Sequence, residues 1–252
     1  MFNALIIAGK QHNKDKISTN KALIEINGKM IVEYVADVVK KIDGVNKIFI
    51  ASNKDDLKKM SFIKKEYMIE CDGTIIDNVL AAVKQIGFDK NILIFTSDIP
   101  MITLEAVNDF LSKTKDNDVQ IYYPIVEESV SKAKFPEMKR TYVRLREGNF
   151  TGGNIFYVDP LIFKKNLKKA RNLLESRKNP LKMAYLLGPI FLIRFIAGRV
   201  SIEDVEKKIL KLIKIKGKAI ISKHSEISCD IDKPGDFIVA AAYMDGNNQL
   251  KA

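Results

Sequence analysis

Five short apolar runs predict β-strands in the first half of the chain. They are ALIIA (4–8), KIFIA (47–51), YMIEC (67–71), ILIFTS (92–97) and VQIYY (119–123). The fourth run is continuously apolar from Ile92 to Phe95, which is typical of a parallel strand that is covered on both faces. A half-exposed strand would instead alternate apolar and polar residues.

Between these runs, apolar residues recur with the period of a helix. Two sets each fall on one helix face: Ile31, Val35, Val38 and Ile42 within 31–42, and Ile76, Val79, Leu80 and Val83 within 75–87. A third helix is expected to begin at Thr103. Strands that alternate with helices in this way predict a Rossmann-like α/β fold, in which helices flank a mostly parallel sheet with right-handed crossovers.

The pattern changes after residue 124. Residues 125–139 mix charges and predict an excursion over the sheet edge, and two strands are expected within 140–158, joined by a tight turn at TGG. From the Asp-Pro pair at 159 the chain is mostly helical to about 215. We therefore expect one domain over 1–252 with a helical insertion over 159–215. A last strand, KAIIS, then leads into SCDIDKPGDF.

The composition is ordinary for a soluble globular protein, with 46% hydrophobic and 29% charged residues. The formal charge of +11 favours anionic partners such as nucleotides, acidic lipids or nucleic acid. The basic residues form no continuous tract and the chain has no Trp, so we do not expect nucleic-acid binding.

Cysteine usage and the apolar runs predict a cytoplasmic protein. Cys71 and Cys229 lie far apart and fit no metal-ligand spacing, so both are expected to be reduced thiols. The first residues, MFNALIIAGK, have no basic region before the apolar run and predict a strand rather than a signal peptide. The apolar stretch within 183–198 is interrupted and too short to span a bilayer.

Asp98 is the first candidate for chemistry, because it follows the buried strand directly. In open α/β sheets the ligand crevice lies at the carboxyl ends of the strands, so an acid there is a candidate metal or phosphate-site residue. An Asp close before Pro100 can also simply cap the turn that precedes the next helix. Position alone leaves both interpretations open.

The polar loop after the first strand is the second candidate. It begins at Gly9 and carries Lys10, Lys14, Lys16 and Lys21. Backbone N–H groups and ammonium groups in such a loop can bind a polyphosphate, although a solvated basic loop has the same composition. The loop lacks the GKS or GKT ending of a P-loop and the GxGxxG of a dinucleotide site.

Four segments together resemble the MobA-like nucleotidyltransferases, which share the nucleotide-diphospho-sugar transferase fold. The segments are LIIAGK, NKALIEINGKMIVEYVADVV, TSDIPMIT and DIDKPGDF. The resemblance implies an enzyme that transfers an NMP unit from an NTP, with GTP or CTP expected, to a phosphorylated small-molecule acceptor. Pyrophosphate would leave, and Mg²⁺ would be the cofactor. Residues 125–215 lie outside the shared part apart from a general likeness at TGGNIF.

The resemblance also implies roles for individual residues. Ala8 and Gly9 let the chain approach the nucleotide, Lys21 reaches its phosphates, and Asp98 is the Mg²⁺ ligand. The family's first loop usually has two glycines and an arginine, whereas this loop has one Gly and no Arg, so Lys10, Lys14 or Lys16 would replace the arginine. His12 is another candidate for the phosphates, although an idle, exposed histidine is the simpler interpretation.

Six further positions have more than one interpretation. Asn53, Asp72 and Gly73 fall where the family contacts base and ribose, but these residue types are also frequent in turns. Asn154 is a candidate acceptor contact, although a plain hairpin with left-handed glycines would explain the TGGN segment equally well. A final segment holds two acids, of which Asp230 is expected to be the second metal ligand and Asp232 the cap of the last helix.

Two other functions are compatible with the sequence. An NDP-sugar-dependent glycosyltransferase would have the same fold and would release NDP. A non-catalytic nucleotide- or membrane-binding module would place KMAYLLGPIFLIRFIAG and the lysines of 207–214 on anionic lipid. Membrane contact is not the expected use of that apolar segment, because neighbouring helices need a core to pack on.

Overall fold

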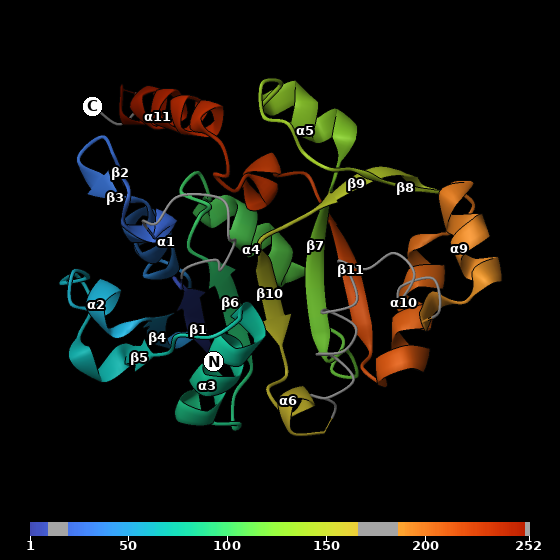
Figure 1. Ribbon diagram of the computed structural model, residues 1–252, viewed down its shortest axis with the longest axis horizontal. Coiled ribbons are helices and arrows are strands. Elements are labelled where there is room, and N and C mark those ends of the chain that lie inside the picture. The colour runs from blue at the N-terminus through green and yellow to red at the C-terminus, as the bar shows by residue number, and fades with distance from the viewer. Residues whose placement is uncertain (10–19, 166–185, 250–252) are drawn as a thin grey trace.

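The computed structural model describes residues 1–9, 20–165 and 186–249, and these form a nine-stranded sheet flanked by helices (Figure 1). The strands of this sheet are β1 (Phe2–Ile7), β4 (Val45–Ser52), β5 (Met68–Glu70), β6 (Ile92–Thr96), β7 (Ile121–Glu127), β8 (Val143–Leu145), β9 (Gly148–Gly152), β10 (Ile155–Val158) and β11 (Gly217–Ser222). A separate two-stranded hairpin consists of β2 (Glu25–Ile26) and β3 (Lys29–Met30).

The helices and 3₁₀ turns connect these strands. The α-helices are α1 (Ile31–Val39), α2 (Lys54–Leu57), α3 (Ile75–Ile86), α4 (Leu104–Ser112), α5 (Glu128–Lys134), α6 (Ile162–Lys165), α9 (Pro189–Ile196), α10 (Ile202–Ile213) and α11 (Pro234–Gln249). The 3₁₀ turns are η1 (Lys21–Leu23), η2 (Lys65–Tyr67) and η3 (Ser225–Ser228).

The division of the chain into one domain with a helical insertion over 159–215 stays a prediction.

The strand order is β5-β4-β1-β6-β10-β7-β9-β8, and β11 pairs with the other edge of β7. Strands β5, β4, β1 and β6 are parallel, whereas β10 runs antiparallel to both β6 and β7. The predicted mostly parallel, Rossmann-like sheet is confirmed. Because the four parallel strands point the same way, the loops that follow them meet at one edge of the sheet.

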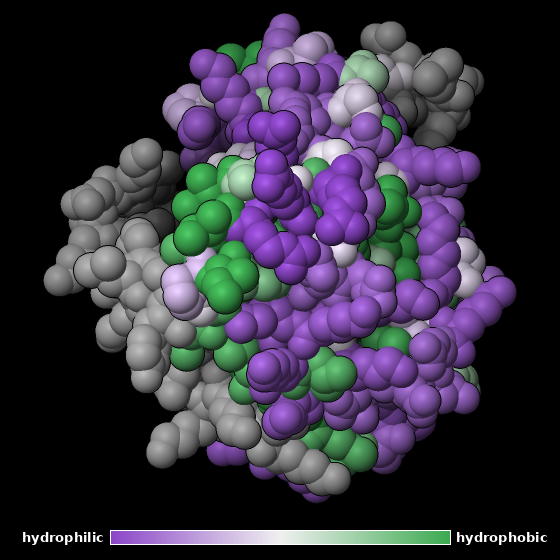
Figure 2. Space-filling model, turned by 90° about the vertical axis from the view of Figure 1, so that its right-hand side faces the viewer, coloured by the Kyte–Doolittle hydropathy of each residue, from purple (hydrophilic) through white to green (hydrophobic). Residues whose placement is uncertain are grey.

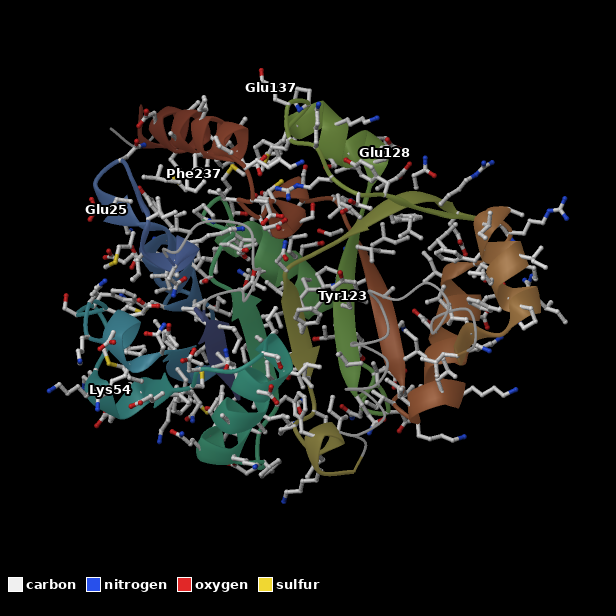
Figure 3. All side chains as sticks on the ribbon, viewed as in Figure 1. Glu25, Lys54, Tyr123, Glu128, Glu137 and Phe237 are labelled. Atoms are coloured by element: carbon white, nitrogen blue, oxygen red, sulfur yellow. The ribbon has the colours of Figure 1, made fainter. Side chains whose placement is uncertain are left out.

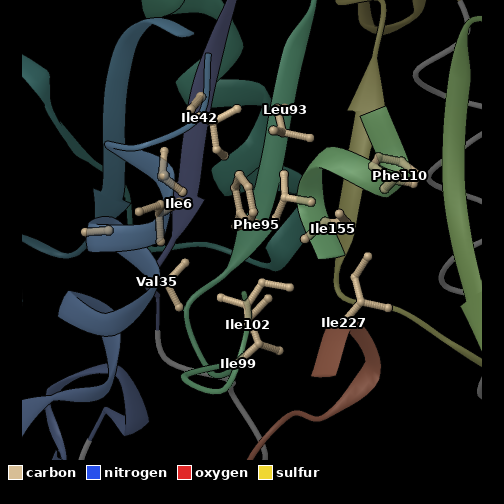
Figure 4. Close-up of a cluster of buried hydrophobic side chains, with 14 of the residues drawn as sticks. Ile6, Val35, Ile42, Leu93, Phe95, Ile99, Ile102, Phe110, Ile155 and Ile227 are labelled. Carbon is tan, nitrogen blue, oxygen red and sulfur yellow. The ribbon is translucent and has the colours of Figure 1, made fainter. Parts of the chain in front are cut away.

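The core lies on both faces of β1, all six residues of which are buried. Successive side chains of a strand point to opposite faces, so Ala4 and Ile6 pack with α1 and α4, whereas Leu5 and Ile7 pack with α3. Figure 4 shows the first of these clusters, in which Phe95 of β6 lies among the residues of β1 and α1. Because both faces of β1 are packed, the carboxyl end of this strand has a fixed position relative to β4 and β6.

The TGG segment is not the predicted hairpin turn. The hairpin turns between β8 and β9, where Gly148 has φ of 146°, and the chain then passes through Gly152 and Gly153 from β9 to β10 along the same strand, β7. Neither Gly152 nor Gly153 has a positive φ. Both allow close approach to β7, because a Cβ on Gly152 would lie 1.7 Å from the Tyr123 hydroxyl and one on Gly153 would lie 2.8 Å from Pro124. Tyr123 lies on β7, in the middle of the sheet (Figure 3).

Residues 125–139 are more regular than the predicted excursion over the sheet edge. The first of these residues complete β7, and α5 follows directly from Glu128 to Lys134.

The apolar stretch within 183–198 is expected from the sequence to pack in the core. Where the structure describes it, it does not do so, because no residue of α9 is buried. Within the described part of the chain, no helix has the length and apolar character that crossing a membrane requires.

We predict that Gly153→Ala lowers the free energy of unfolding by about 1–3 kcal/mol, because the added Cβ would lie 3.1 Å and 3.2 Å from the carbonyl oxygens of Pro124 and Ile227. Urea unfolding followed by circular dichroism measures this change. Gly246→Ala in α11 is the control, because no heavy atom lies within 4 Å of its added Cβ. Equal midpoints for the two variants would contradict the close-approach explanation.

Candidate functional site

Asp98 lies two residues beyond the end of β6, and its side chain is 9% exposed. The backbone there is fixed, because the Ser97 N–H donates to the Ile7 carbonyl at 3.1 Å. The cap of α4 is Thr103, whose side chain accepts from the Ala106 N–H, so Asp98 is not needed for that role. Its Oδ1 is buried and has no hydrogen-bond partner within the described structure.

Three carboxylates meet at this edge of the sheet. The Ile231 N–H donates to the carbonyl oxygen of Asp98 at 2.9 Å. This bond brings residues 230–232, the DID segment, against the end of β6. One carboxylate oxygen from each of Asp98, Asp230 and Asp232 lies within 4.8 Å of the other two. Among the residues that the structure describes, these three form the only group of His, Cys, Asp or Glu with this spacing.

Two cations lie against the cluster. Lys21 Nζ is 2.5 Å from Asp232 Oδ1. Arg140 comes from the segment between α5 and β8, and its guanidinium donates from Nη1 to Asp230 Oδ1 and from Nη2 to the Asp230 carbonyl, both at 2.5 Å. The Arg140 side chain is 7% exposed, and its Nε has no hydrogen-bond partner within the described structure. The sequence prediction missed Arg140.

The electrostatics of the three acids differ. Burial raises the pKa of Asp98, an effect that the charge of Lys21 opposes. Burial, together with the other two carboxylates, raises the pKa of Asp230 to about 6 even though Arg140 opposes the shift. Burial also acts to raise the pKa of Asp232, but the hydrogen bond from Lys21 outweighs it and holds that pKa below its ordinary value. Two of the three carboxylates are therefore costly to ionise without a further cation.

The structure also revises the predicted capping of the last helix. The carboxylate of Asp232 pairs with Lys21. The backbone N–H groups of Asp232 and Lys233, before α11, donate to Asp236 Oδ2 at 2.9 Å each. The assignment of Asp232 as the cap is therefore wrong, and its carboxylate lies in the cluster beside Asp230. The repeated acids of DID gave no signal to distinguish these roles.

The first loop begins at the same edge of the sheet. The carbonyl oxygen of Ala8 accepts from Asn20 Nδ2 at 2.6 Å and from Ser52 Oγ at 2.8 Å. Asn20 also donates to Asp56 Oδ2 at 2.8 Å, so one buried amide joins the two ends of the loop to α2. Sequence reasoning missed Asn20. The predicted phosphate contacts His12, Lys10, Lys14 and Lys16 lie outside the described residues.

Gly9 and Gly73 are brought together by Asn78, a buried polar residue of α3. Asn78 Oδ1 accepts from the Gly73 N–H at 2.8 Å. A Cβ on Gly9 would lie 2.7 Å from Asn78 Nδ2, so the loop after β1 packs directly on this amide. Asn78 was also missed, although a polar residue on the buried face of a helix is a signal that sequence inspection can detect.

The remaining predicted residues are placed as follows. Asn53 caps α2, accepting from the Asp56 N–H at 3.0 Å and donating to Asp56 Oδ2 at 2.5 Å. Asp72 is exposed beyond β5. Asn154 joins two elements through its backbone, because its carbonyl accepts from Thr96 at 3.0 Å and its N–H donates to Ile227 at 2.9 Å. Of these residues, Asn53 has a structural role for its side chain, because both of its polar atoms bond to Asp56 at the start of α2.

Comparisons with known proteins agree with this arrangement. A family model described as the MobA-like NTP transferase domain matches residues 4–184. The chain belongs to this family. Its predicted membership is confirmed, and nucleotidyl transfer in general is the activity that the family supports.

Three solved structures have folds similar to this one. A hypothetical transferase from Thermus thermophilus is 30% identical, with a TM-score of 0.81 over 94% of this chain and all of that chain. A 4-diphosphocytidyl-2C-methyl-D-erythritol synthase from Anaerococcus prevotii has a TM-score of 0.58 and 13% identity over 97% of this chain and 96% of that one. A CMP:2-keto-3-deoxy-manno-octonic acid synthetase, solved with CTP, has a TM-score of 0.62 and 15% identity over 97% and 99%. The last two show the fold alone.

A curated relative of this MobA-like chain is the bifunctional protein GlmU of Buchnera aphidicola subsp. Schizaphis graminum. The two are 26% identical over 124 residues, which is 48% of this chain. The match spans only 27% of the length of GlmU, so the activities of that whole protein do not carry over.

We predict that both thiols are inert in the native protein. Burial raises the pKa of Cys71 to about 11 and that of Cys229, beside the cluster, to about 12. At neutral pH the thiolate fraction is therefore at least about a hundredfold lower than for an ordinary cysteine, and access is blocked as well. Titration with a chromogenic disulfide should detect no thiol in the native protein and both after denaturation. Rapid native labelling of Cys229 would show that the edge of the site opens.

Proposed function

We propose that this chain is a Mg²⁺-dependent nucleotidyltransferase that transfers an NMP unit from an NTP to a phosphorylated small-molecule acceptor and releases pyrophosphate. The observation that carries the proposal is the buried Asp98 Oδ1, which has no partner in the described structure and lies beside two further carboxylates at the end of β6. Membership of the MobA-like family supports the reaction class.

The three carboxylates suit a magnesium ion in type and charge. Mg²⁺ prefers oxygen ligands and is usually held by one or two carboxylates together with substrate phosphates. With all groups ionised, three carboxylates beside Lys21 and Arg140 leave one negative charge, and burial has raised the pKa of Asp98 and Asp230. We propose Asp98 and Asp230 as the ligands, with Asp232 beside them. When bound, the ion would neutralise charge on the donor phosphates and hold their oxygens.

Lys21 is proposed to bind the donor phosphates. Its ammonium is held in the cluster by Asp232 and remains 24% exposed, so it is positioned but still accessible. Ala8 and Gly9 would provide the close backbone approach to the nucleotide, because the buried amides of Asn20 and Asn78 fix both residues. Lys10 is proposed as a further phosphate contact. Asp72 and Gly73 are proposed to contact base or ribose, and Asn53 is proposed there in addition to its capping role.

The reaction needs positioning and charge neutralisation rather than a protein nucleophile. An oxygen of the acceptor phosphate forms a bond to the α-phosphorus of the NTP. The bond between that phosphorus and the oxygen bridging to the β-phosphate breaks, and pyrophosphate leaves with the bridging oxygen. Lys21 would stabilise the negative charge that develops on the departing phosphates. Asn154, beside the end of β6, is proposed to contact the acceptor.

Arg140 is proposed as a positioning residue. It holds both the carboxylate and the carbonyl of Asp230, and a planar guanidinium is suited to such a two-point contact. In this position it fixes the direction of one proposed metal ligand without contacting substrate. It also offsets part of the cost of placing three acids together.

The first test is Asp98→Asn, which keeps the size of the side chain and removes its charge. Pyrophosphate release from an NTP, assayed with a panel of phosphorylated acceptors, should fall by about a thousandfold or more. The stabilisation that Mg²⁺ gives the NTP complex, measured as a rise in melting temperature, should be lost as well. The matched control is Asp118→Asn, since that side chain is 87% exposed.

The outcomes separate the candidate activities. Release of pyrophosphate by the wild-type protein and its loss in the Asp98→Asn variant support the proposal. Wild-type turnover in that variant would refute the role of Asp98. Release of NDP from an NDP-sugar would assign the chain to the glycosyltransferases of the same fold. A thermal-shift screen of the four NTPs with Mg²⁺ identifies the donor, with GTP or CTP expected.

The second test is Arg140→Lys, which keeps the charge and loses the two-point contact. We expect the apparent Mg²⁺ affinity to fall about 10–100-fold, because outer ligands of this kind orient the first ones. The NTP affinity without metal should change little, which distinguishes positioning from direct phosphate binding. The melting temperature followed during a Mg²⁺ titration at saturating NTP measures the first effect, and an NTP titration without Mg²⁺ measures the second. A larger loss of metal-free NTP binding than of Mg²⁺ affinity would instead place Arg140 on the substrate.

A further inference from the structure

Helix α9 exposes an apolar surface that the fold leaves uncovered. Six of its eight residues are Ile, Leu or Phe, and none of the eight is buried. Ile190, Ile193 and Ile196 are 76%, 68% and 75% exposed. They are three residues apart, so they lie along one side of the helix. We call these three isoleucines the α9 patch.

A single exposed isoleucine needs no explanation, but three on the same side of one short helix do. Contacts with the rest of the described chain account for only some residues of α9, such as Phe191, Leu192 and Phe195, which are partly buried. The α9 patch exposes more than two-thirds of each isoleucine. This side of α9 therefore contributes nothing to the packing of the described chain.

Basic residues from three other segments surround the helix. Arg144 lies against Gly198, where an added Cβ would be 2.8 Å from its Nε, and Lys208 Nζ lies 5.5 Å from the ring centre of Phe191. Arg199 is exposed, and the Arg146 side chain is 63% exposed. Figure 2 views this end of the molecule and shows strongly hydrophilic surface directly beside hydrophobic surface.

The described segment around α9 is itself basic. Residues 186–218, which include α9 and α10, contain eight Lys and Arg but only three Asp and Glu, a net +5. A second copy of the chain would place the same basic residues opposite one another, which opposes self-association through the α9 patch. An anionic surface complements both the charge and the apolar residues.

We propose that α9 docks this protein on the surface of an anionic lipid bilayer. The α9 patch would enter the boundary between headgroups and acyl chains, and Arg144, Arg146, Arg199 and Lys208 would contact lipid phosphates. The helix lies in the interface and does not cross the membrane. This inference rests on the surface alone, so it does not depend on the proposed transferase activity.

The test is co-sedimentation of the whole protein with phosphatidylcholine vesicles that contain or lack phosphatidylglycerol. Binding is expected only with the anionic lipid and should weaken as salt is raised. The triple variant Ile190→Gln, Ile193→Gln and Ile196→Gln should partition at least about tenfold more weakly, because it buries less apolar surface. The double variant Arg199→Gln and Lys208→Gln should lose about fivefold for each charge removed.

The control is Ile238→Gln, because Ile238 is 71% exposed on α11, outside the α9 patch. It should bind vesicles like the wild type, and circular dichroism should show that all variants are folded. Absence of wild-type binding to anionic vesicles would overturn the proposal, as would equal binding of the triple and control variants. A dimer seen by light scattering that only the triple variant loses, without vesicle binding, would instead assign the α9 patch to self-association.

Discussion

The hydrogen bond from the Ile231 N–H to the Asp98 carbonyl is the contact on which the site depends. It joins segments more than 130 residues apart in sequence and places three carboxylates within 4.8 Å of one another. Like charges at such distances are unfavourable in a partly buried site. Lys21 and Arg140 offset that repulsion only in part, because the pKa of Asp98 and that of Asp230 remain raised. A further positive charge at this point would reduce the repulsion among the three carboxylates.

The rest of the edge is organised to hold these groups still. Asn20 and Asn78 are buried amides that fix the loops after β1 and β5, and neither belongs to the carboxylate cluster. A buried amide is favourable only when its polar atoms are bonded, so each one specifies a single loop conformation. The antiparallel strand β10 contributes similarly, because the backbone of Asn154 connects the end of β6 to η3. Rigid surroundings keep the carboxylates from moving apart.

The sequence was sufficient for the mostly parallel sheet and for the position of Asp98 just past a buried strand, because continuous apolar runs and strand ends are local signals. It was not sufficient for Arg140, which lies 90 residues from Asp230 and has no local pattern that marks it. Adjacent glycines at 152 and 153 signal either a turn or close packing, and only the position of Tyr123 and Pro124 distinguishes the two. Asn53 and Asp232 were ambiguous for the same reason, since caps and ligands use the same residue types.

The charge of the chain illustrates how composition can mislead about a site. A net +11 favours a nucleotide partner, yet part of the excess lies on residues 186–218, which carry a net +5. In that segment, α9 and α10 are beyond β7 and β11, at the far end of the sheet from β1 and β4 (Figure 1). Exposed charges are screened within about 8 Å at physiological salt, so the basic residues of α9 and α10 contribute little at the carboxylate cluster. The phosphate binding that we propose there therefore relies on Lys21 and on the proposed metal ion. The basic residues around α9 suit instead the second anionic partner that we propose for the other end of the sheet.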